Sequence, residues 1–129
     1  MIQLGIDPSL NFTGWAVSRG DVVLGSGVIK TRGTTEVEKL LSLHEQMVDK
    51  CISLCPETSI IEVQNPFGAY FKRRGASGVG LNTEALNKQN WAIGAILLTL
   101  GLYKIPVRTV TVLEWKGKMN KATAKMLAS

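Results

Sequence analysis

The sequence predicts one α/β domain built on a mixed five-stranded sheet with helices on both faces. Two observations lead to this prediction. Three strand-like runs come first, and helix and strand then alternate, so the expected order is βββαβαβα. A meander followed by crossover connections contains both antiparallel and parallel strand pairs. No repeat, linker or low-complexity tract interrupts residues 1–129, and we therefore expect a single domain over this whole length.

Each predicted strand is a short run rich in Ile, Val and Leu and bounded by turn residues. Asp7-Pro8-Ser9 separates the first two runs, and Arg19-Gly20-Asp21 is short enough for a hairpin between the second and third. The predicted strands are residues 2–7, 13–19, 22–29, 58–64 and 105–112.

The helices are predicted from apolar residues at helical spacing. The first runs from Thr35 to Leu54 and begins with a capping box of Thr35 and Glu38. The second runs from Asn82 to Leu100, with Gly101 expected as its left-handed C-cap. A third begins at residue 120. One stripe of the second helix indicates either a homodimer face or a face packed on its own sheet: Leu86, Ile93, Leu97 and Leu100.

The charge is unevenly distributed along the chain. Residues 1–64 contain five Lys or Arg and eight Asp or Glu, whereas residues 65–129 contain ten and two. The net charges of −3 and +8 indicate a polyanionic partner for the second half, although a solvated basic surface would look the same. A Gly-rich loop over 65–80 carries three aromatic residues and three consecutive cations.

Two carboxylates are expected to meet at one edge of the sheet. Asp7 closes the first strand and Glu62 lies near the end of the fourth. If these strands are parallel neighbours, both side chains emerge at the carboxyl edge, where ligand sites of such sheets form. Oxygen ligands at this spacing suit Mg²⁺ or Mn²⁺. The alternative is structural, because Asp-Pro-Ser is also an ordinary turn and a single Glu can sit in an edge strand.

Four blocks resemble, in order and over nearly the whole chain, the RuvC family of Holliday junction resolvases. They are "LGIDPSLNFTGWAV", "LGSGVIKT", "SIIEVQNPF" and "PVRTVTVLEWKGKMNKATAKM", and they are most similar to divergent phage-type members. The resemblance implies an RNase H-like fold and a homodimer that resolves four-way DNA junctions by paired nicks. The resemblance also implies two Mg²⁺ or Mn²⁺ ions per site. The expected cleavage products carry 5′-phosphate and 3′-hydroxyl ends.

The resemblance also assigns roles to individual residues. Asp7 and Glu62 match the first two metal-binding acids, and Lys116 and Lys121 match lysines that assist catalysis. Phe67 matches an aromatic residue that stacks at the junction centre. The remaining expected DNA contacts are Tyr70, Phe71, Lys72, Arg73, Arg74 and Lys118.

The sequence departs from the family pattern near its end. The family's other two acids follow an Asp-x-x-Asp-like pattern in the last helix, but no acid follows Glu114 here. We therefore expect the last helix to be incomplete. A non-catalytic junction-binding module on the same fold is a second hypothesis. A third is an actin-like ATPase lobe, because "GIDPSLNFTGWA" also resembles the phosphate loop of that group.

No membrane or secretion signal is evident in the sequence. The apolar run from Trp91 to Tyr103 is too short to cross a bilayer, and the N-terminus lacks the features of a signal peptide. Cys51 and Cys55 are more typical of reduced thiols than of metal ligands. We expect a cytoplasmic protein of a bacterial cell, encoded by the host or by a phage.

Overall fold

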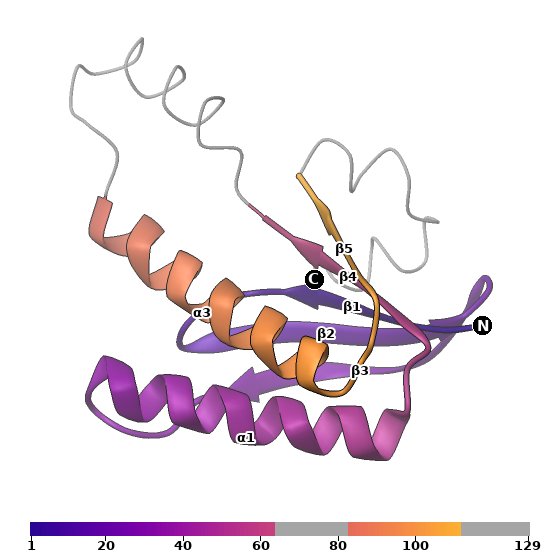
Figure 1. The fold of residues 1–129 in the computed structure, drawn as a ribbon, viewed down its shortest axis with the longest axis horizontal. Helices are drawn as coiled ribbons and strands as arrows, with labels where there is room; N and C mark the ends of the chain where they lie inside the picture. The colour runs from indigo at the N-terminus through magenta and orange to yellow at the C-terminus, as the bar shows by residue number, and fades with distance from the viewer. Residues whose placement is uncertain (64–82, 112–129) are drawn as a thin grey trace, which may run out of the picture.

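The computed structural model describes residues 1–63 and 83–111. Its strands form one five-stranded sheet in the order β3-β2-β1-β4-β5 (Figure 1). The expected helix from residue 120 lies outside the described residues. The elements are β1 (Ile2–Asp7), β2 (Phe12–Arg19), β3 (Val22–Lys30), α1 (Glu36–Leu54), β4 (Thr58–Glu62), α3 (Thr83–Leu102) and β5 (Val107–Val110).

The sheet is mixed, as predicted. β1, β2 and β3 form an antiparallel meander, whereas β1 pairs with β4 and β4 with β5 in parallel. Gly20 supplies a left-handed residue in the tight turn between β2 and β3, with φ of 59°. The central strand β1 therefore has an antiparallel neighbour on one side and a parallel neighbour on the other.

The hydrophobic core lies between one face of the sheet and the two described helices, which both cover that face (Figure 1). Alternate residues of the strands point toward the helices, and apolar residues of α1 and α3 fill the space between them. The prediction also placed a helix on the other face of the sheet. Any such helix would consist of residues outside those described. The buried core consists of Leu4, Ile6, Val17, Ile29, Leu43, Met47, Cys51, Ile61, Ala92, Ile93, Ile96, Leu100 and Ile105.

The start of α1 confirms the predicted capping box. The Thr35 hydroxyl accepts a hydrogen bond from the Glu38 N–H at 3.1 Å, and Glu38 Oε1 accepts one from the Thr35 N–H at 3.0 Å. Both groups would otherwise be left without a partner at a helix N-terminus. The capping box therefore sets where the polypeptide enters the helix.

The end of α3 differs from the prediction. The helix continues through Gly101 to Leu102, and the left-handed residue is Lys104, with φ of 57°. Ile105 N–H donates to the Leu100 carbonyl at 3.0 Å and Lys104 N–H to the Gly101 carbonyl at 3.0 Å, which is the Schellman pattern. Burial of Ile105 against the core decides this end, and the Gly signal alone misplaced it.

The apolar stripe considered as a dimer face packs mainly on this chain's own core. Ile93 is 9% exposed and Leu100 is fully buried, and Leu97 packs partly buried against the same cluster. The alternative that this stripe packs on its own sheet is therefore the correct one. Neither α1 nor α3, the helices of the described part, is long and apolar enough to span a bilayer.

Candidate active site

Asp7 and Glu62 lie at the carboxyl ends of two neighbouring parallel strands. Ile6 is opposite Ile61, and Asp7 and Glu62 are the next residues along β1 and β4. Neighbouring strands are about 4.8 Å apart, and side chains at one register position of parallel strands point to the same face. Because the two isoleucines point into the helix-covered core, the two carboxylates emerge together from the opposite face.

The Asp7 carboxylate lies in an electrostatically unfavourable position. Its side chain is half-buried, and burial raises the pKa of the Asp7 carboxyl above its ordinary value. Within residues 1–63 and 83–111, no hydrogen bond or ion pair reaches this carboxylate. A half-buried carboxylate without a described partner is a group that a bound cation would stabilise.

The residue facing Asp7 on the other side of β1 leaves space beside the carboxylate. Gly14 of β2 is the antiparallel register partner of Asp7. A Cβ placed on Gly14 would lie 3.7 Å from the Asp7 Cβ, so any larger side chain would project over the acid. Glycine at this position keeps the face of the sheet beside Asp7 open to a ligand.

The loop that follows Asp7 borders a second feature of the site. A cavity of about 320 Å³ is lined by residues 8–11 together with Lys88 and Gln89 of α3. Lys88 forms ion pairs with Glu84 at 3.2 Å and with Glu36 at 3.6 Å. Since the Lys88 charge is matched by two acids, this cavity does not form a strong anion site.

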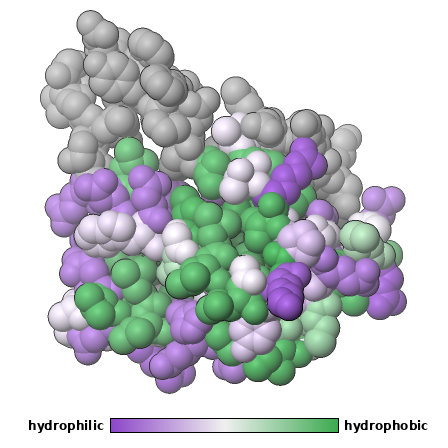
Figure 2. Space-filling view, in the orientation of Figure 1, coloured by the Kyte–Doolittle hydropathy of each residue, from purple (hydrophilic) through white to green (hydrophobic). Residues whose placement is uncertain are grey.

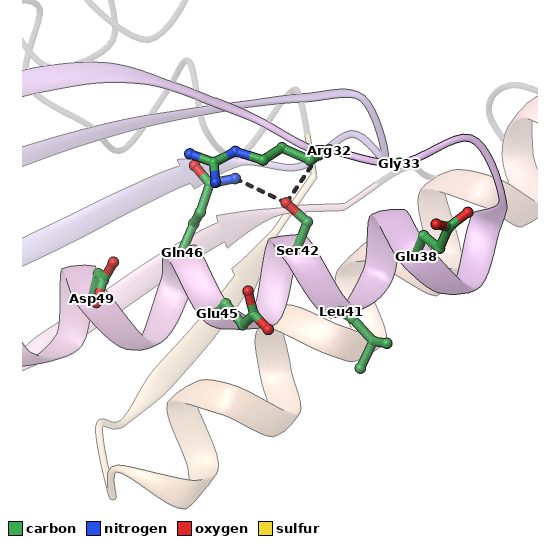
Figure 3. Close-up of a pocket in the computed structure, with 8 residues that line it drawn as sticks. All are labelled: Arg32, Gly33, Glu38, Leu41, Ser42, Glu45, Gln46 and Asp49. Carbon is green, nitrogen blue, oxygen red and sulfur yellow. Dashed lines mark hydrogen bonds between the residues drawn. The ribbon is translucent and has the colours of Figure 1, made fainter.

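A larger hollow lies elsewhere, between the Arg32–Gly33 segment and α1 (Figure 3). Its volume is about 470 Å³, and neither Asp7 nor Glu62 lines it. Ser42 organises its wall by accepting hydrogen bonds from the Arg32 backbone N–H at 2.9 Å and from Gln46 at 3.1 Å. The lining residues are Arg32, Gly33, Glu38, Leu41, Ser42, Glu45, Gln46 and Asp49.

All nine of the other predicted site residues lie outside the described part of the chain. This applies to the catalytic lysines and to the whole aromatic and basic loop. Their roles therefore remain predictions. These residues are Phe67, Tyr70, Phe71, Lys72, Arg73, Arg74, Lys116, Lys118 and Lys121.

Three residues that the sequence did not single out hold the loop after Asp7. Thr13 bonds to Ser9, Thr31 donates to the Leu10 carbonyl, and Gln89 donates to the Pro8 carbonyl. The Gln89 contact joins residues 81 positions apart, and no local pattern reports such a contact. A threonine at the start of a strand is also too common to attract notice by itself.

Comparisons with known proteins identify the family. A protein of Rickettsia felis named crossover junction endodeoxyribonuclease RuvC is 32% identical over 127 residues, which cover 95% of this chain and 70% of that protein. The protein of the same name from Rickettsia akari is 33% identical over 112 residues, covering 84% of this chain and 64% of that protein. The chain belongs to the RuvC family.

Solved structures agree with this assignment at the level of fold. Thermus thermophilus RuvC in complex with a Holliday junction substrate matches with a TM-score of 0.74 at 21% identity, over 95% of this chain and 72% of that chain. A second structure of the same RuvC matches with a TM-score of 0.69. The RNase H-like α/β fold is confirmed. No family model matches the sequence.

RuvC membership implies the use of divalent metal ions. Asp7 and Glu62 fit, because they present hard oxygen ligands side by side and Asp7 lacks a described cationic partner. Among the described residues, no group of three or more His, Cys, Asp or Glu is arranged to hold an ion. A metal ion held by these two carboxylates would therefore need further ligands from protein, water or substrate.

Proposed function

We propose that this chain is a metal-dependent, structure-selective DNA endonuclease domain that resolves four-way junctions. The relatives named crossover junction endodeoxyribonuclease support the reaction class. The Thermus thermophilus neighbour in complex with a Holliday junction substrate supports branched DNA as the ligand. The proposal is carried by one observation: Asp7 and Glu62 are adjacent on parallel strands, and Asp7 is desolvated without a described partner.

In this proposal Asp7 and Glu62 hold Mg²⁺ or Mn²⁺, with two ions per site. Bound divalent cations would supply Lewis-acid chemistry, neutralising the scissile phosphate and lowering the pKa of a water molecule. The two carboxylates give the site negative charge before DNA arrives, and the rigid strand ends beneath them fix their positions. The expected products carry a 5′-phosphate and a 3′-hydroxyl.

We assign DNA binding and transition-state stabilisation to the second half of the chain, whose net charge is +8. Cationic side chains there would bind backbone phosphates, giving an affinity that falls as salt rises. Aromatic side chains would stack on unpaired bases at the junction centre. The proposed phosphate-binding or catalytic residues are Lys72, Arg73, Arg74, Lys116, Lys118 and Lys121, and the proposed stacking residues are Phe67, Tyr70 and Phe71.

We also propose that residues 1–129 act as one domain in the cytoplasm of a bacterial cell. Support comes from a continuous sheet and core in the described residues and from relatives in bacteria. A phage origin is a finer proposal, supported by the phage-type character of the sequence blocks. The relatives favour the RuvC hypothesis over an actin-like ATPase lobe.

The proposed activity is tested with a labelled four-way junction in Mg²⁺ or Mn²⁺. We expect paired symmetric nicks from the wild-type protein. Asp7→Asn and Glu62→Gln each keep the shape of the side chain and remove its charge, and we expect each to lower the cleavage rate by about a hundredfold or more while junction binding is retained. Asp21→Asn is the matched control, because Asp21 lies exposed in the β2–β3 turn.

Three results would contradict the proposal. Cleavage by Asp7→Asn and Glu62→Gln at the wild-type rate would remove both residues from the chemistry. Junction binding without cleavage in either metal would identify the second hypothesis, a binding module. Absence of junction binding by the wild-type protein would exclude both functions.

We propose that the active form is a homodimer, because a four-way junction needs two symmetric nicks. The exposed face of α3 is the proposed contact, since it carries Trp91 at 48%, Leu98 at 63% and Leu102 at 63% exposed. These residues and Gly94 share one helical face, and a Cβ on Gly94 would meet nothing within 4 Å. Figure 2 shows apolar surface gathered over the helices.

Sedimentation or light scattering tests this dimer. We expect the wild-type protein to be dimeric and Leu98→Asp to be monomeric, because a buried aspartate at the contact lacks a partner. Leu41→Asp is the control, since Leu41 is 57% exposed on the other described helix. A monomeric wild-type protein, or equal loss of the dimer in both variants, would contradict the proposed face.

A further inference from the structure

The β1–β2 connection is a four-residue loop that begins directly after Asp7. Although it is a loop, it is well packed: Pro8 is buried and Leu10 is 4% exposed. Buried loop backbone requires a hydrogen-bond partner for each peptide group, because water cannot supply one. The partners of this loop therefore show what holds its shape.

Thr13 supplies both partners for one residue of the loop. Its side chain is fully buried, and its hydroxyl accepts a hydrogen bond from the Ser9 N–H at 3.2 Å while donating to the Ser9 carbonyl at 2.7 Å. A single hydroxyl thus satisfies the donor and the acceptor of one peptide residue. This contact closes the loop between its second residue and the second residue of β2.

Other contacts hold the remainder of the loop to neighbouring elements. The Thr31 hydroxyl donates to the Leu10 carbonyl at 2.7 Å, and the Thr31 N–H donates to the Asn11 carbonyl at 3.1 Å. Gln89 reaches the Pro8 carbonyl only at 3.4 Å. The contact between Thr13 and Ser9 is the one in which a β2 side chain bonds both backbone groups of a single loop residue.

The position of this contact relates it to Asp7. Ser9 is two residues after Asp7, and Thr13 directly precedes Gly14, the register partner of Asp7. The hydroxyl therefore joins the two chain segments that flank the acid. Because no described residue forms a hydrogen bond or an ion pair with the Asp7 carboxylate, its direction depends on the backbone that carries it.

We propose that Thr13 is a positioning residue: its hydroxyl locks the loop after Asp7 and so aims the Asp7 carboxylate at a bound divalent cation. The inference rests on the proposed function, since it matters only if Asp7 holds a metal ion. The Thr13 hydroxyl acts through the Ser9 backbone, to which its hydrogen bonds go.

Two variants of Thr13 separate this role from packing. Thr13→Val keeps the branched shape and removes the hydroxyl, whereas Thr13→Ser keeps the hydroxyl. Thr99→Val is the matched control, because Thr99 is also fully buried and its hydroxyl donates to the Ala95 carbonyl at 2.8 Å, within α3. All three proteins are compared with wild type for Mn²⁺ binding, for amide exchange at Ser9 without metal, and for the metal dependence of junction cleavage.

We expect Thr13→Val to weaken Mn²⁺ binding by about tenfold and to raise the metal concentration for half-maximal cleavage to a similar extent. Amide exchange at Ser9 should become faster in metal-free Thr13→Val. Thr13→Ser should restore all three properties, and Thr99→Val should lower stability without changing metal affinity. Wild-type metal affinity in Thr13→Val, no rescue by Thr13→Ser, or the same loss in Thr99→Val would overturn the inference.

The experiment distinguishes failure of the inference from failure of the proposed function. If the wild-type protein does not cleave junctions, the proposed activity fails. The role of Thr13 is then judged from Mn²⁺ binding without cleavage. Weaker binding by Thr13→Val than by wild type supports the positioning role, and equal binding overturns it. If the wild type cleaves and Thr13→Val does so with the same metal dependence, only the inference fails.

Discussion

Two carboxylates in this molecule occupy opposite electrostatic situations. Glu38, in the first turn of α1, accepts hydrogen bonds from the Thr35 N–H at 3.0 Å and the Thr35 hydroxyl at 2.9 Å, and also from Thr34. These bonds, above all that from the Thr35 backbone, lower the pKa of the Glu38 carboxyl. Asp7, at the end of β1, has a raised pKa because of burial and has no described partner.

Glu38 is an acid that the fold surrounds with donors, whereas Asp7 is an acid that the described fold leaves without a partner. The Glu38 carboxylate is fully exposed, so water would solvate it in the folded and the unfolded protein. The chain nevertheless surrounds it with hydrogen-bond donors, because they complete a helix cap. Asp7 needs partners more, since it is half-buried, and the described fold supplies none. A group left in this condition is a functional-site candidate on physical grounds.

The strongest test of this difference is the Asp7→Asn variant in metal-free protein. A folded-state pKa above the unfolded value means that ionised Asp7 opposes folding at neutral pH, and that this penalty vanishes below the unfolded pKa of about 3.9. We therefore expect Asp7→Asn to raise the thermal unfolding midpoint in EDTA at pH 7, but not near pH 3. The same variant should lose cleavage by about a hundredfold or more.

Metal addition sharpens the same prediction. Mg²⁺ or Mn²⁺ should raise the unfolding midpoint of wild type more than that of Asp7→Asn. The reason is that a metal ion stabilises a protein only to the extent that it binds the native state, and Asp7→Asn should bind it more weakly. Asp21→Asn serves as the control at both pH values. A less stable Asp7→Asn at pH 7 would show that Asp7 supports the fold and would remove the contrast with Glu38.

Thr35→Ala tests the structural member of the comparison. Loss of the N-cap hydroxyl removes the bond to the Glu38 N–H, and we expect the free energy of unfolding to fall by about 1 kcal/mol. Urea denaturation measures this change, and Thr34→Ala is the comparison variant, because it removes a hydroxyl bond to the Glu38 carboxylate but keeps the N-cap bond. Metal affinity and cleavage should match wild type, and a large loss of either would connect the cap to the site.

The smallest expected effect belongs to Glu38→Gln, which keeps an acceptor oxygen and removes the charge. Since hydrogen bonds from Thr35 lower the pKa of Glu38, its charge contributes stability that is present above the unfolded pKa of about 4.3 and lost as pH falls through the folded value. The unfolding midpoints of wild type and Glu38→Gln should differ at pH 7 and converge near pH 3. A difference independent of pH would contradict this account.

Local patterns were sufficient wherever a feature depends on nearby residues. The antiparallel meander and the Thr35 capping box were predicted because hairpin spacing and cap chemistry act within a few positions. The Gly101 cap was predicted incorrectly for the opposite reason. Burial of Ile105 carries the helix end onward to Lys104, and that burial depends on the whole core.

In the candidate site, too, some residues could be predicted from local sequence and others could not. Asp7 and Glu62 were identified because a carboxylate in an apolar strand is conspicuous in a sequence, and the crossover helix between them indicates parallel pairing. The roles of Thr13 and Gln89 were not identified, because a hydroxyl or an amide gives no sign of its partner until the chain is folded. The apolar stripe of α3 also could not be assigned to core or surface from spacing alone.

The amino-acid sequence by itself determined the element order over the described residues, the cap of α1 and the two acids at the strand ends, since each follows from side-chain chemistry and periodicity over a few residues. Only the tertiary structure decided that Asp7 and Glu62 each follow the last register pair of β1 and β4, that Asp7 is desolvated without a described partner, and that Thr13 closes the loop beside it. The physical reason is that burial and pairing are properties of segments brought together from distant positions, and their energies exist only when those segments are in contact.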